Sequence, residues 1–516
     1  MSRSTSPLVA IEPRLRHLLP ADLYAAAWVT PSSSVLMKVF EHLRTLQRIL
    51  YDYVPRHVSE ALPNPGESRY EWQDGALMFT DLAGFTPLLE ANAVSGSAGA
   101  ESLLNVLNAY FAEMIEIISK SGGNLLEFTG DAMLVQFPAD QRHTDTARAV
   151  RAGLRMQRAM IRFGDIETPQ GNFSLGMRIG VNTGRVLTAD IGTPRRMEHV
   201  LLGSAVRGTK HAEGSGKVGR VCMTESAYES VSHTFRGEPG KADYTLVMDD
   251  FAAEQLGEYD IAPASRRLAA SMLFDRSVEG LVMEIEKSVR TVEPLASYLP
   301  MPILNLLVES AARRQIQPTF PDLTVLFVNL NGLPEAVDRA LPGEESEIVS
   351  VFSRVFALIN AAVEARGGVL KNVTYQLAGS DMLIYFGVPN AHTDDSIRAA
   401  YVARAVQDVV HNLTPPTIGG QEVEFSFQIG MARGPVFAAE VGEPRGRREF
   451  NILGDAVNVA ARLMGRASKN QILMTETVYY EIAHQFNCES IGSIALKGKA
   501  APLPVYALHS IAEARF

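Results

Sequence analysis

Residues 76–86 read Ala-Leu-Met-Phe-Thr-Asp-Leu-Ala-Gly-Phe-Thr, and residues 324–333 read Thr-Val-Leu-Phe-Val-Asn-Leu-Asn-Gly-Leu. In both stretches an apolar run is followed by a polar residue and a glycine turn. Asn329 therefore matches Asp81 at an offset of 248 (329 minus 81). Because later motifs repeat at nearly the same offset, the chain contains a duplicated domain. These stretches predict two copies of one strand–turn–helix unit.

The two copies retain opposite polar residues. The first copy has Phe128-Thr-Gly-Asp131 where the second has Leu377-Ala-Gly-Ser380. Further on, the second copy reads Leu453-Gly-Asp-Ala-Val-Asn458-Val-Ala-Ala-Arg462, whereas the first reads Leu202-Gly-Ser-Ala-Val-Arg207-Gly-Thr-Lys-His211. One copy keeps two carboxylates and the other keeps an asparagine and an arginine. Since neutral decay would not spare complementary halves, we expect one composite site across a pseudo-twofold interface.

The composition is that of a soluble globular chain, with 46% apolar and 21% charged residues among 516. A net charge of −10 argues against nucleic-acid or anionic-membrane partners, which require a basic face. Cys222 and Cys488 are expected to be free thiols in a reducing compartment. We find no apolar run of about 18 residues and no signal-peptide core. We therefore expect a cytoplasmic protein without a membrane span.

Breaks in the apolar pattern divide the chain into four segments. Prolines interrupt residues 1–34, which we expect to be loosely ordered, and helical spacing predicts one amphipathic helix in 35–62. Each copy then predicts a mixed sheet flanked by helices, so the fold class is α/β, an α+β sandwich. The segments are 1–67, an N-terminal leader and amphipathic helix; 68–262, the first domain; 263–319, a helical linker; and 320–511, the second domain.

The retained residues suit phosphate chemistry. Asp81 at a strand end and Asp131 at a hairpin tip can meet as oxygen ligands for Mg²⁺, although an Asp beside a Gly is more often a turn residue. The turn after Asp81 leads into a helix whose free N–H groups favour phosphate. Asn458 and Arg462 are four residues apart on one helix face. An amide there could orient a ribose, and a guanidinium could neutralise charge on a transferring phosphate.

Together these motifs resemble the class III nucleotidyl cyclases over nearly all of residues 70–260 and 320–510. The tandem arrangement is most similar to the soluble, bicarbonate-responsive adenylyl cyclases and their bacterial relatives. The resemblance implies two tandem cyclase catalytic domains that form an internal pseudo-twofold dimer. The motifs that carry it are Phe79-Thr-Asp-Leu-Ala-Gly-Phe-Thr86, Thr129-Gly-Asp131, Met177-Arg-Ile-Gly-Val-Asn-Thr-Gly184, Leu453-Gly-Asp-Ala-Val-Asn-Val-Ala-Ala-Arg462 and Leu496-Lys-Gly-Lys499.

The resemblance also implies a role for each site residue. It makes the chain an adenylate cyclase with two Mg²⁺ (or Mn²⁺) ions and ATP as substrate. The implied roles are metal binding by Asp81, Leu82 and Asp131; ribose positioning by Asn458; transition-state stabilisation by Arg462; and phosphate binding by Arg178, Lys497, Phe85 and Thr86. Arg178 matches Gln428 in the second copy, and the first copy has no Lys-Gly-Lys. Both positions agree with a single composite site.

Base selection departs from the family pattern. Many adenylyl cyclases read adenine with a Lys and an Asp or Thr, and the matching positions here are Gln376 and Asn451. Guanylyl cyclases typically have Glu and Cys there. An amide can donate and accept, so either purine can be read. We favour ATP; a guanylate cyclase and a catalytically silent nucleotide-binding regulatory module are the alternatives.

A second, degenerate cleft is expected on the opposite side of the pseudo-twofold axis. It would be bounded by Glu127, Arg207, Lys210, His211, Asn329 and Ser380. Lys210 matches a cationic anion-binding residue of the bicarbonate-responsive relatives, whereas Glu127 replaces another cation. A possible regulatory site for a small anion or other effector is therefore centred on Glu127, Arg207 and Lys210. Because one chain carries both halves of the composite site, we expect a monomer.

Overall fold

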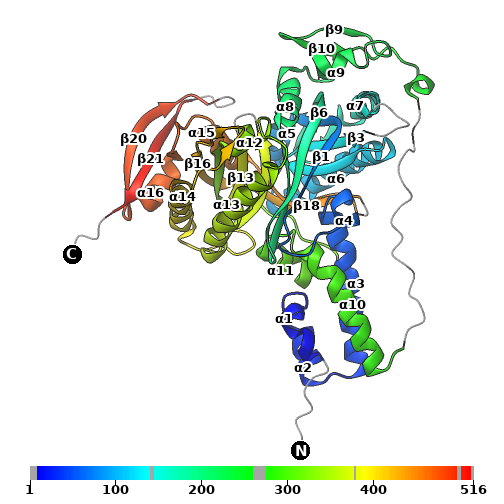
Figure 1. Ribbon diagram of the computed structural model, residues 1–516, viewed down its shortest axis with the longest axis vertical. Coiled ribbons are helices and arrows are strands. Elements are labelled where there is room, and N and C mark those ends of the chain that lie inside the picture. Colours follow the sequence, from blue (N-terminus) through cyan, green and yellow to red (C-terminus); the bar gives the residue numbers. More distant parts are fainter. Residues whose placement is uncertain are drawn as a thin grey trace, which may run out of the picture.

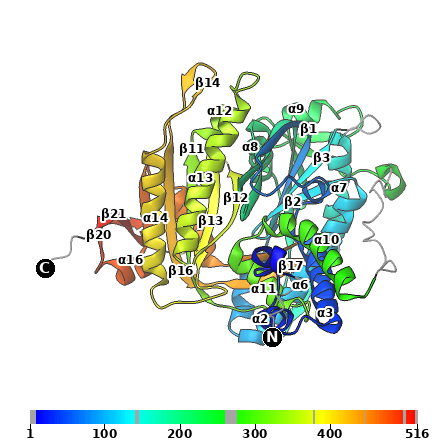
Figure 2. The same cartoon turned by 60° about the horizontal axis from the view of Figure 1, so that its bottom comes forward.

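The computed structural model places the two copies side by side (Figures 1 and 2). It describes residues 8–139, 145–257, 259, 275–376, 379–444, 446–496 and 501–512, without the side chains of Pro334, Tyr375 and Gln376. Each copy is a mixed sheet with helices packed against it. The predicted fold class, two tandem domains of mixed α/β structure, is confirmed.

The two main sheets have the same strand order, β2-β3-β1-β6-β8-β10-β9 and β12-β13-β11-β16-β19-β21-β20, with β7 paired to β6. In each sheet one pair, β6 with β8 or β16 with β19, is parallel. The strands of the first domain are β1 (Arg69–Ala83), β2 (Asn124–Thr129), β3 (Ala132–Pro138), β4 (Ile166–Thr168), β5 (Gly171–Phe173), β6 (Gly176–Thr193), β7 (Arg196–Leu202), β8 (Val221–Thr224), β9 (Gly237–Pro239) and β10 (Tyr244–Val247). Those of the second are β11 (Asp322–Asn331), β12 (Val369–Gln376), β13 (Gly379–Phe386), β14 (Thr417–Ile418), β15 (Gln421–Glu422), β16 (Ser426–Pro435), β17 (Phe437–Gly442), β18 (Arg448–Leu453), β19 (Gln471–Thr475), β20 (Phe486–Ile494) and β21 (Leu503–Ile511).

The helices follow the same repeat. Apolar residues at helical spacing bury one side of each long helix against its sheet. The first domain contains α5 (Phe85–Ala93), α6 (Gly96–Lys120), α7 (Asp145–Ala159), α8 (Ser204–Ser215) and α9 (Glu225–Glu229), with short 3₁₀ helices η2 (Met160–Phe163) and η3 (Ala253–Leu256). The second contains α12 (Leu333–Val337), α13 (Glu345–Ala365), α14 (Asp395–His411), α15 (Asp455–Met464) and α16 (Glu476–Ile482).

Each domain extends a β-hairpin arm into the core of the other. The β6–β7 arm of the first domain buries Leu187 and Ile191 in the same apolar cluster as α13 of the second. Conversely, Phe437 and Val441 of the β17–β18 arm lie in the cluster that contains α6 of the first. This reciprocal burial fixes the two sheets relative to each other across the pseudo-twofold axis.

Two lead-in helices, α3 (Ser33–Tyr53) and α10 (Val278–Ala296), lie side by side below the domains (Figure 1). Their ends make equivalent contacts. The hydroxyl of Tyr53 donates to Glu440 Oε2 at 2.5 Å, and that of Tyr298 donates to Asp190 Oδ1 at 2.9 Å. Each helix is followed by a shorter one, α4 (Arg56–Glu60) or α11 (Met301–Ser310), so the predicted helix in 35–62 is broken at Pro55.

The prediction that residues 1–34 are loosely ordered is wrong for the described part of that segment. It forms η1 (Val9–Ile11), α1 (Glu12–Leu15) and α2 (Ala21–Val29). Leu15 and Leu18 are buried in the apolar cluster that contains α3 and α10. Prolines limit the length of each helix, but burial of the leucines still orders the segment.

One helix in the described residues, α13, is long and apolar enough to cross a membrane by length and composition. Eight of its residues, including Phe352, Phe356 and Ile359, are buried inside the protein. A long apolar helix of this kind is equally typical of a protein core. The pattern therefore agrees with a core helix of the second domain.

Candidate active site

A cavity of about 450 Å³ lies between the two domains. The first domain contributes the start of α5 and the turn between β2 and β3. The second contributes the sheet face of β11, β12, β13 and β16, the end of β18, and one side of α15 along its length from Asp455 to Met464. The cavity therefore joins the carboxylate-bearing turn of one copy to the asparagine-bearing helix of the other.

Two carboxylates of the first domain lie close to each other at this junction. Asp131 occupies the β2–β3 turn and lines the cavity, and Asp81 lies near the end of β1. Burial, together with the negative charge of Asp81, raises the pKa of Asp131 to about 7. A divalent cation would offset this unfavourable proximity, and carboxylate oxygens are its preferred ligands. The residues present therefore fit a metal site.

Arg178 has closer partners than expected. The antiparallel register of β1 and β6 sets it opposite Asp81. Its guanidinium forms ion pairs with Asp81 and with Glu213 Oε1 of α8, the latter at 2.9 Å. Arg178 is thus a counter-ion of the first carboxylate in this structure, whereas the family resemblance implied that it binds phosphate.

The turn after Asp81 delivers the start of α5 to the cavity. Gly84 adopts φ +86°, and a Cβ there would meet the carbonyl of Ser174, so the turn requires glycine. Phe85 and Thr86, the first residues of α5, line the cavity. Their unpaired backbone N–H groups are therefore placed where a phosphate could bind.

The helix α15 contributes the second half of the candidate site. It begins after Gly454, and Gly454, Asp455 and Asn458 line the cavity. Asn458 is exposed, which leaves its amide accessible to a ligand. Arg462 lies one turn further along the same face and is half-buried. The expected phosphate ligand Lys497 lies outside the described residues.

The two residues predicted to select the base are placed differently from that expectation. Asn451 is buried, and its amide is occupied: Nδ2 donates to Gly130 O at 2.7 Å and Oδ1 accepts from Ile452 N at 3.0 Å. Asn451 is absent from the described cavity lining. The side chain of Gln376 lies outside the described residues.

Three buried polar residues of the second domain line the cavity and were missed from the sequence: Asn372, Thr374 and Asp381. Strand register explains the omission. Glu127 pairs with Leu134 in the first copy, and its counterpart is Asn372, which pairs with Leu383. The sequence itself contains a sign of this shift. The residue-number offset between the copies is 245 at the Gly-Gly pairs before these hairpins (367 minus 122) but 249 at the turn glycines (379 minus 130). Four extra residues therefore lengthen the second hairpin.

The residues expected to bound a degenerate cleft are neutral or mutually compensating, and one of them, Asn329, lines the candidate cavity instead. Asn329 donates to Gln428 Oε1 at 2.9 Å, where the first domain has Asp81 and Arg178. Lys210 is buried, and burial lowers the pKa of its ammonium while the negative charge of Glu127 raises it. Burial raises the pKa of Glu127 to about 7. The expected small-anion site therefore contains an internal cation beside an internal carboxylate.

Two segments of the chain, residues 68–248 and 316–510, match the adenylate and guanylate cyclase catalytic domain. Together they cover most of the sequence. The chain belongs to the adenylate and guanylate cyclase catalytic domain family. The resemblance to class III cyclases that the motifs predicted is thereby confirmed. Class III cyclases use divalent metal ions, in agreement with the Asp81–Asp131 arrangement.

Relatives within this family include both tandem and single-domain matches. The chain is 24% identical over 464 residues to adenylate cyclase type 10 of Rattus norvegicus, covering 84% of this chain and 26% of the relative. It is 31% identical over 219 residues to an adenylate cyclase of Mycobacterium tuberculosis, covering 42% of this chain and 46% of the relative. The chain thus spans about a quarter of the rat protein's length.

Among solved structures, a class III adenylyl cyclase-like ATP-binding protein from Pseudomonas aeruginosa has a similar fold over both domains. The TM-score is 0.55 at 14% identity, with 86% of this chain and 92% of that chain covered. This likeness supports the tandem cyclase fold described above.

Proposed function

We propose that the protein is an adenylate cyclase that converts ATP to cyclic AMP and pyrophosphate at one composite site between its domains. The observation that carries the proposal is the single cavity lined by Asp131 of the first domain and Asn458 of the second. The names of the rat and mycobacterial relatives support ATP as the substrate. Neither domain alone retains both sets of residues.

In the proposed reaction Asn458 orients the ribose so that its 3′-oxygen faces the α-phosphorus. The 3′-oxygen bonds to that phosphorus, the bond to the oxygen bridging to the β-phosphate breaks, and the hydroxyl proton passes to solvent. Arg462 offsets the charge that develops on the α-phosphate. Lys497 and the N–H groups of Phe85 and Thr86 hold the departing pyrophosphate.

Two Mg²⁺ or Mn²⁺ ions, held by Asp81, Asp131 and the Leu82 carbonyl, would lower the pKa of the 3′-hydroxyl and neutralise phosphate charge. Arg178 would exchange its contact with Asp81 for one with the β- and γ-phosphates. Glu213, its second partner, would keep the guanidinium near the site. The proposal therefore requires Asp81 to be released from Arg178 when nucleotide binds.

Base recognition is assigned to the cavity wall formed by Asn372, Thr374 and Asp381. Asn372 Nδ2 and Asp381 Oδ1 are buried and have no hydrogen-bond partner among the described residues. A donor and an acceptor so placed can bind N1 and the exocyclic amine of adenine. Asn451, predicted from the sequence, already bonds Gly130 O and Ile452 N through its amide and would then not contact the base.

A catalytically silent ATP-binding role is the second candidate. One observation favours it: Arg178 forms an ion pair with Asp81, one of the two proposed metal ligands. Purified protein should be incubated with Mn²⁺ and either ATP or GTP, followed by detection of cyclic nucleotide. We expect cyclic AMP to form faster than cyclic GMP. Faster cyclic GMP formation would indicate a guanylate cyclase, and nucleotide binding without either product would indicate the silent role. We further propose that the active species is a cytoplasmic monomer.

A further inference from the structure

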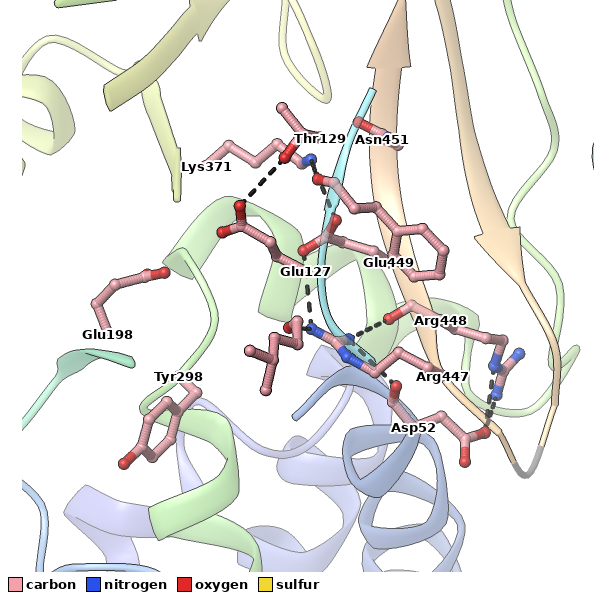
Figure 3. A network of polar contacts seen from close by, with 12 residues as sticks. Asp52, Glu127, Thr129, Glu198, Tyr298, Lys371, Arg447, Arg448, Glu449 and Asn451 are labelled. Atoms are coloured by element: carbon pink, nitrogen blue, oxygen red, sulfur yellow. Dashed lines mark hydrogen bonds and ion pairs between the residues drawn. The ribbon is translucent and has the colours of Figure 1, made fainter. Parts of the chain in front are cut away.

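The edge strand β2 of the first domain is held by three side chains of the second domain, and Figure 3 shows where they lie. Backbone carbonyls of alternate residues along β2 and its turn accept these hydrogen bonds. Arg447 Nη2 donates to Leu126 O at 3.3 Å, Lys371 Nζ to Phe128 O at 3.3 Å, and Asn451 Nδ2 to Gly130 O at 2.7 Å. We call this set, Arg447, Lys371 and Asn451, the carbonyl ladder.

The carbonyl ladder is buried, and its two cations share one carboxylate partner. Its three side chains are at most 7% exposed. Glu449, on the same strand as Asn451, forms an ion pair with Lys371 at 3.1 Å and lies 3.9 Å from Arg447. Hydrogen bonds from charged donors in such surroundings are stronger than those between neutral groups. The ladder therefore restrains β2 against the second domain, most tightly at Gly130, where the bond is 2.7 Å long.

The ladder ends beside the metal-binding carboxylate. Gly130, held by its last member, immediately precedes Asp131 in the β2–β3 turn and adopts φ +70°. Within the first domain the turn is closed by the pairing of Thr129 with Ala132. Asn451 adds a restraint from the other domain, so the position of the Asp131 carboxylate depends on both domains.

The pseudo-twofold counterpart of the ladder is incomplete. Arg196, the counterpart of Arg447, donates to Lys371 O at 3.1 Å on β12. However, the strand register shows that the first-domain counterpart of Lys371 is Leu126 and that the counterpart of Asn451 is the buried Val200. Neither apolar side chain can donate a hydrogen bond. Among the described residues, the complete ladder thus occurs on β2, the strand that leads to Asp131, and not on its counterpart β12. A role in packing the two domains together would not explain this difference.

We propose that Lys371 and Asn451 are positioning residues that set the metal-binding turn of the first domain from the second domain. This inference rests on the proposed function, since it concerns the metal site of the same reaction. It also gives Asn451 a role different from base selection. The isosteric change Asn451→Asp distinguishes the two roles, because a carboxylate cannot donate to Gly130 O. A positioning role predicts weaker metal binding, whereas a base-selecting role predicts an altered ratio of ATP to GTP turnover.

The experiment measures Mn²⁺ binding by electron paramagnetic resonance with α,β-methylene-ATP present, so that it needs no turnover. We expect Lys371→Met and Asn451→Asp each to raise the Mn²⁺ concentration for half-saturation by roughly tenfold, the effect of losing one buried hydrogen bond. Lys371→Arg, which keeps a cationic donor, should remain close to wild type. The ratio of ATP to GTP turnover should not change in any of these variants.

Three outcomes would overturn the inference. One is that folded Asn451→Asp binds Mn²⁺ as the wild type does but has an altered ratio of ATP to GTP turnover. That result would show that Asn451 selects the base. Another is equal loss of Mn²⁺ binding in Lys371→Arg and Lys371→Met, and the third is a wild-type protein that binds no Mn²⁺. Thermal melting identifies variants that fail to fold. A wild-type protein that binds Mn²⁺ but forms no cyclic nucleotide would contradict the proposed function alone and leave the ladder testable.

Discussion

At the residue scale, catalysis is predicted to depend on groups from both domains. Asp131→Ala and Arg462→Ala should each lower cyclase activity on the order of 100-fold or more, because one removes a metal ligand and the other a transition-state cation. Asp81→Ala should behave in the same way. Initial rates with Mn²⁺ and ATP, compared at equal folded protein by thermal melting, measure these effects.

The degenerate cleft supplies the matched controls for that prediction. Ser380 corresponds to Asp131, and the exposed His211 corresponds to Arg462. Ser380→Ala and His211→Ala should keep most of the wild-type rate, since neither residue belongs to the proposed site. A loss at either position as large as that of Asp131→Ala, in folded protein, is incompatible with a single composite site.

Base preference gives a second prediction at this scale. Asn372→Glu should shift the ratio of ATP to GTP turnover towards GTP by about tenfold, since a carboxylate can accept from N1–H and the exocyclic amine of guanine. Gln376→Glu, at the position that ungapped sequence matching selected, should have a smaller effect. The larger shift in Gln376→Glu would show that the sequence assignment was the correct one.

At the element scale, the junction between α4 and the β6–β7 arm contains two histidines whose rings meet edge to face, with an interplanar angle of 71°. His57 Nε2 lies 3.2 Å from His199 Nε2, and His199 Nδ1 lies 2.9 Å from Asp190 Oδ1. Burial and the neighbouring His199 lower the pKa of His57 from 6.5 to about 3. In the unfolded chain the same group binds a proton near pH 6.5.

The sign of the resulting pH dependence follows from this difference. Below pH 6.5 the unfolded chain binds a proton that folded His57 does not, so the free energy of unfolding falls as pH falls towards 3. The contribution of one such group is at most about 1.4 kcal/mol per pH unit. Between pH 7.5 and 5.5, the melting temperature of His57→Gln should fall less than that of wild type. His233→Gln, at an exposed histidine, serves as the control and should follow wild type; equal pH slopes for all three proteins would contradict the assignment.

The elements also show which parts of the structure the sequence could predict. The duplication and the mixed sheet with flanking helices in each copy follow from motif order and apolar periodicity, whereas the strand order and the pairing of the Asp81 strand with the Arg178 strand come from the structure. The position of Asn372 does not follow from the motifs either, because the offset between the copies changes within a hairpin that is longer in the second copy. The occupied amide of Asn451 was equally inaccessible, since its partner Gly130 belongs to the other domain.

At the scale of the whole molecule, the two domains are joined by exchange of their arms. Leu187 and Ile191 of the first domain lie in a core dominated by the second, and Phe437 and Val441 show the reverse. Separating the domains would expose these side chains, at a cost of about 1.5–3 kcal/mol for each large one. The first and second domains are therefore expected to stay associated under native conditions.

This arrangement predicts the result of mixing two inactive variants. Asp131→Ala lacks the metal half and Arg462→Ala lacks the helix half, so a dimer that paired the first domain of one chain with the second domain of another would restore a complete site. A covalent linkage holds the partner domain at an effective concentration around millimolar, far above that of a second chain in a dilute assay. Equimolar mixtures should therefore show no activity beyond the sum of the two variants. Recovery of activity on mixing would show that the site assembles between chains.

Dilution of the wild-type protein tests the same arrangement independently. Its activity per mole should stay constant through the nanomolar range, and a steep decline would again show that the site assembles between chains.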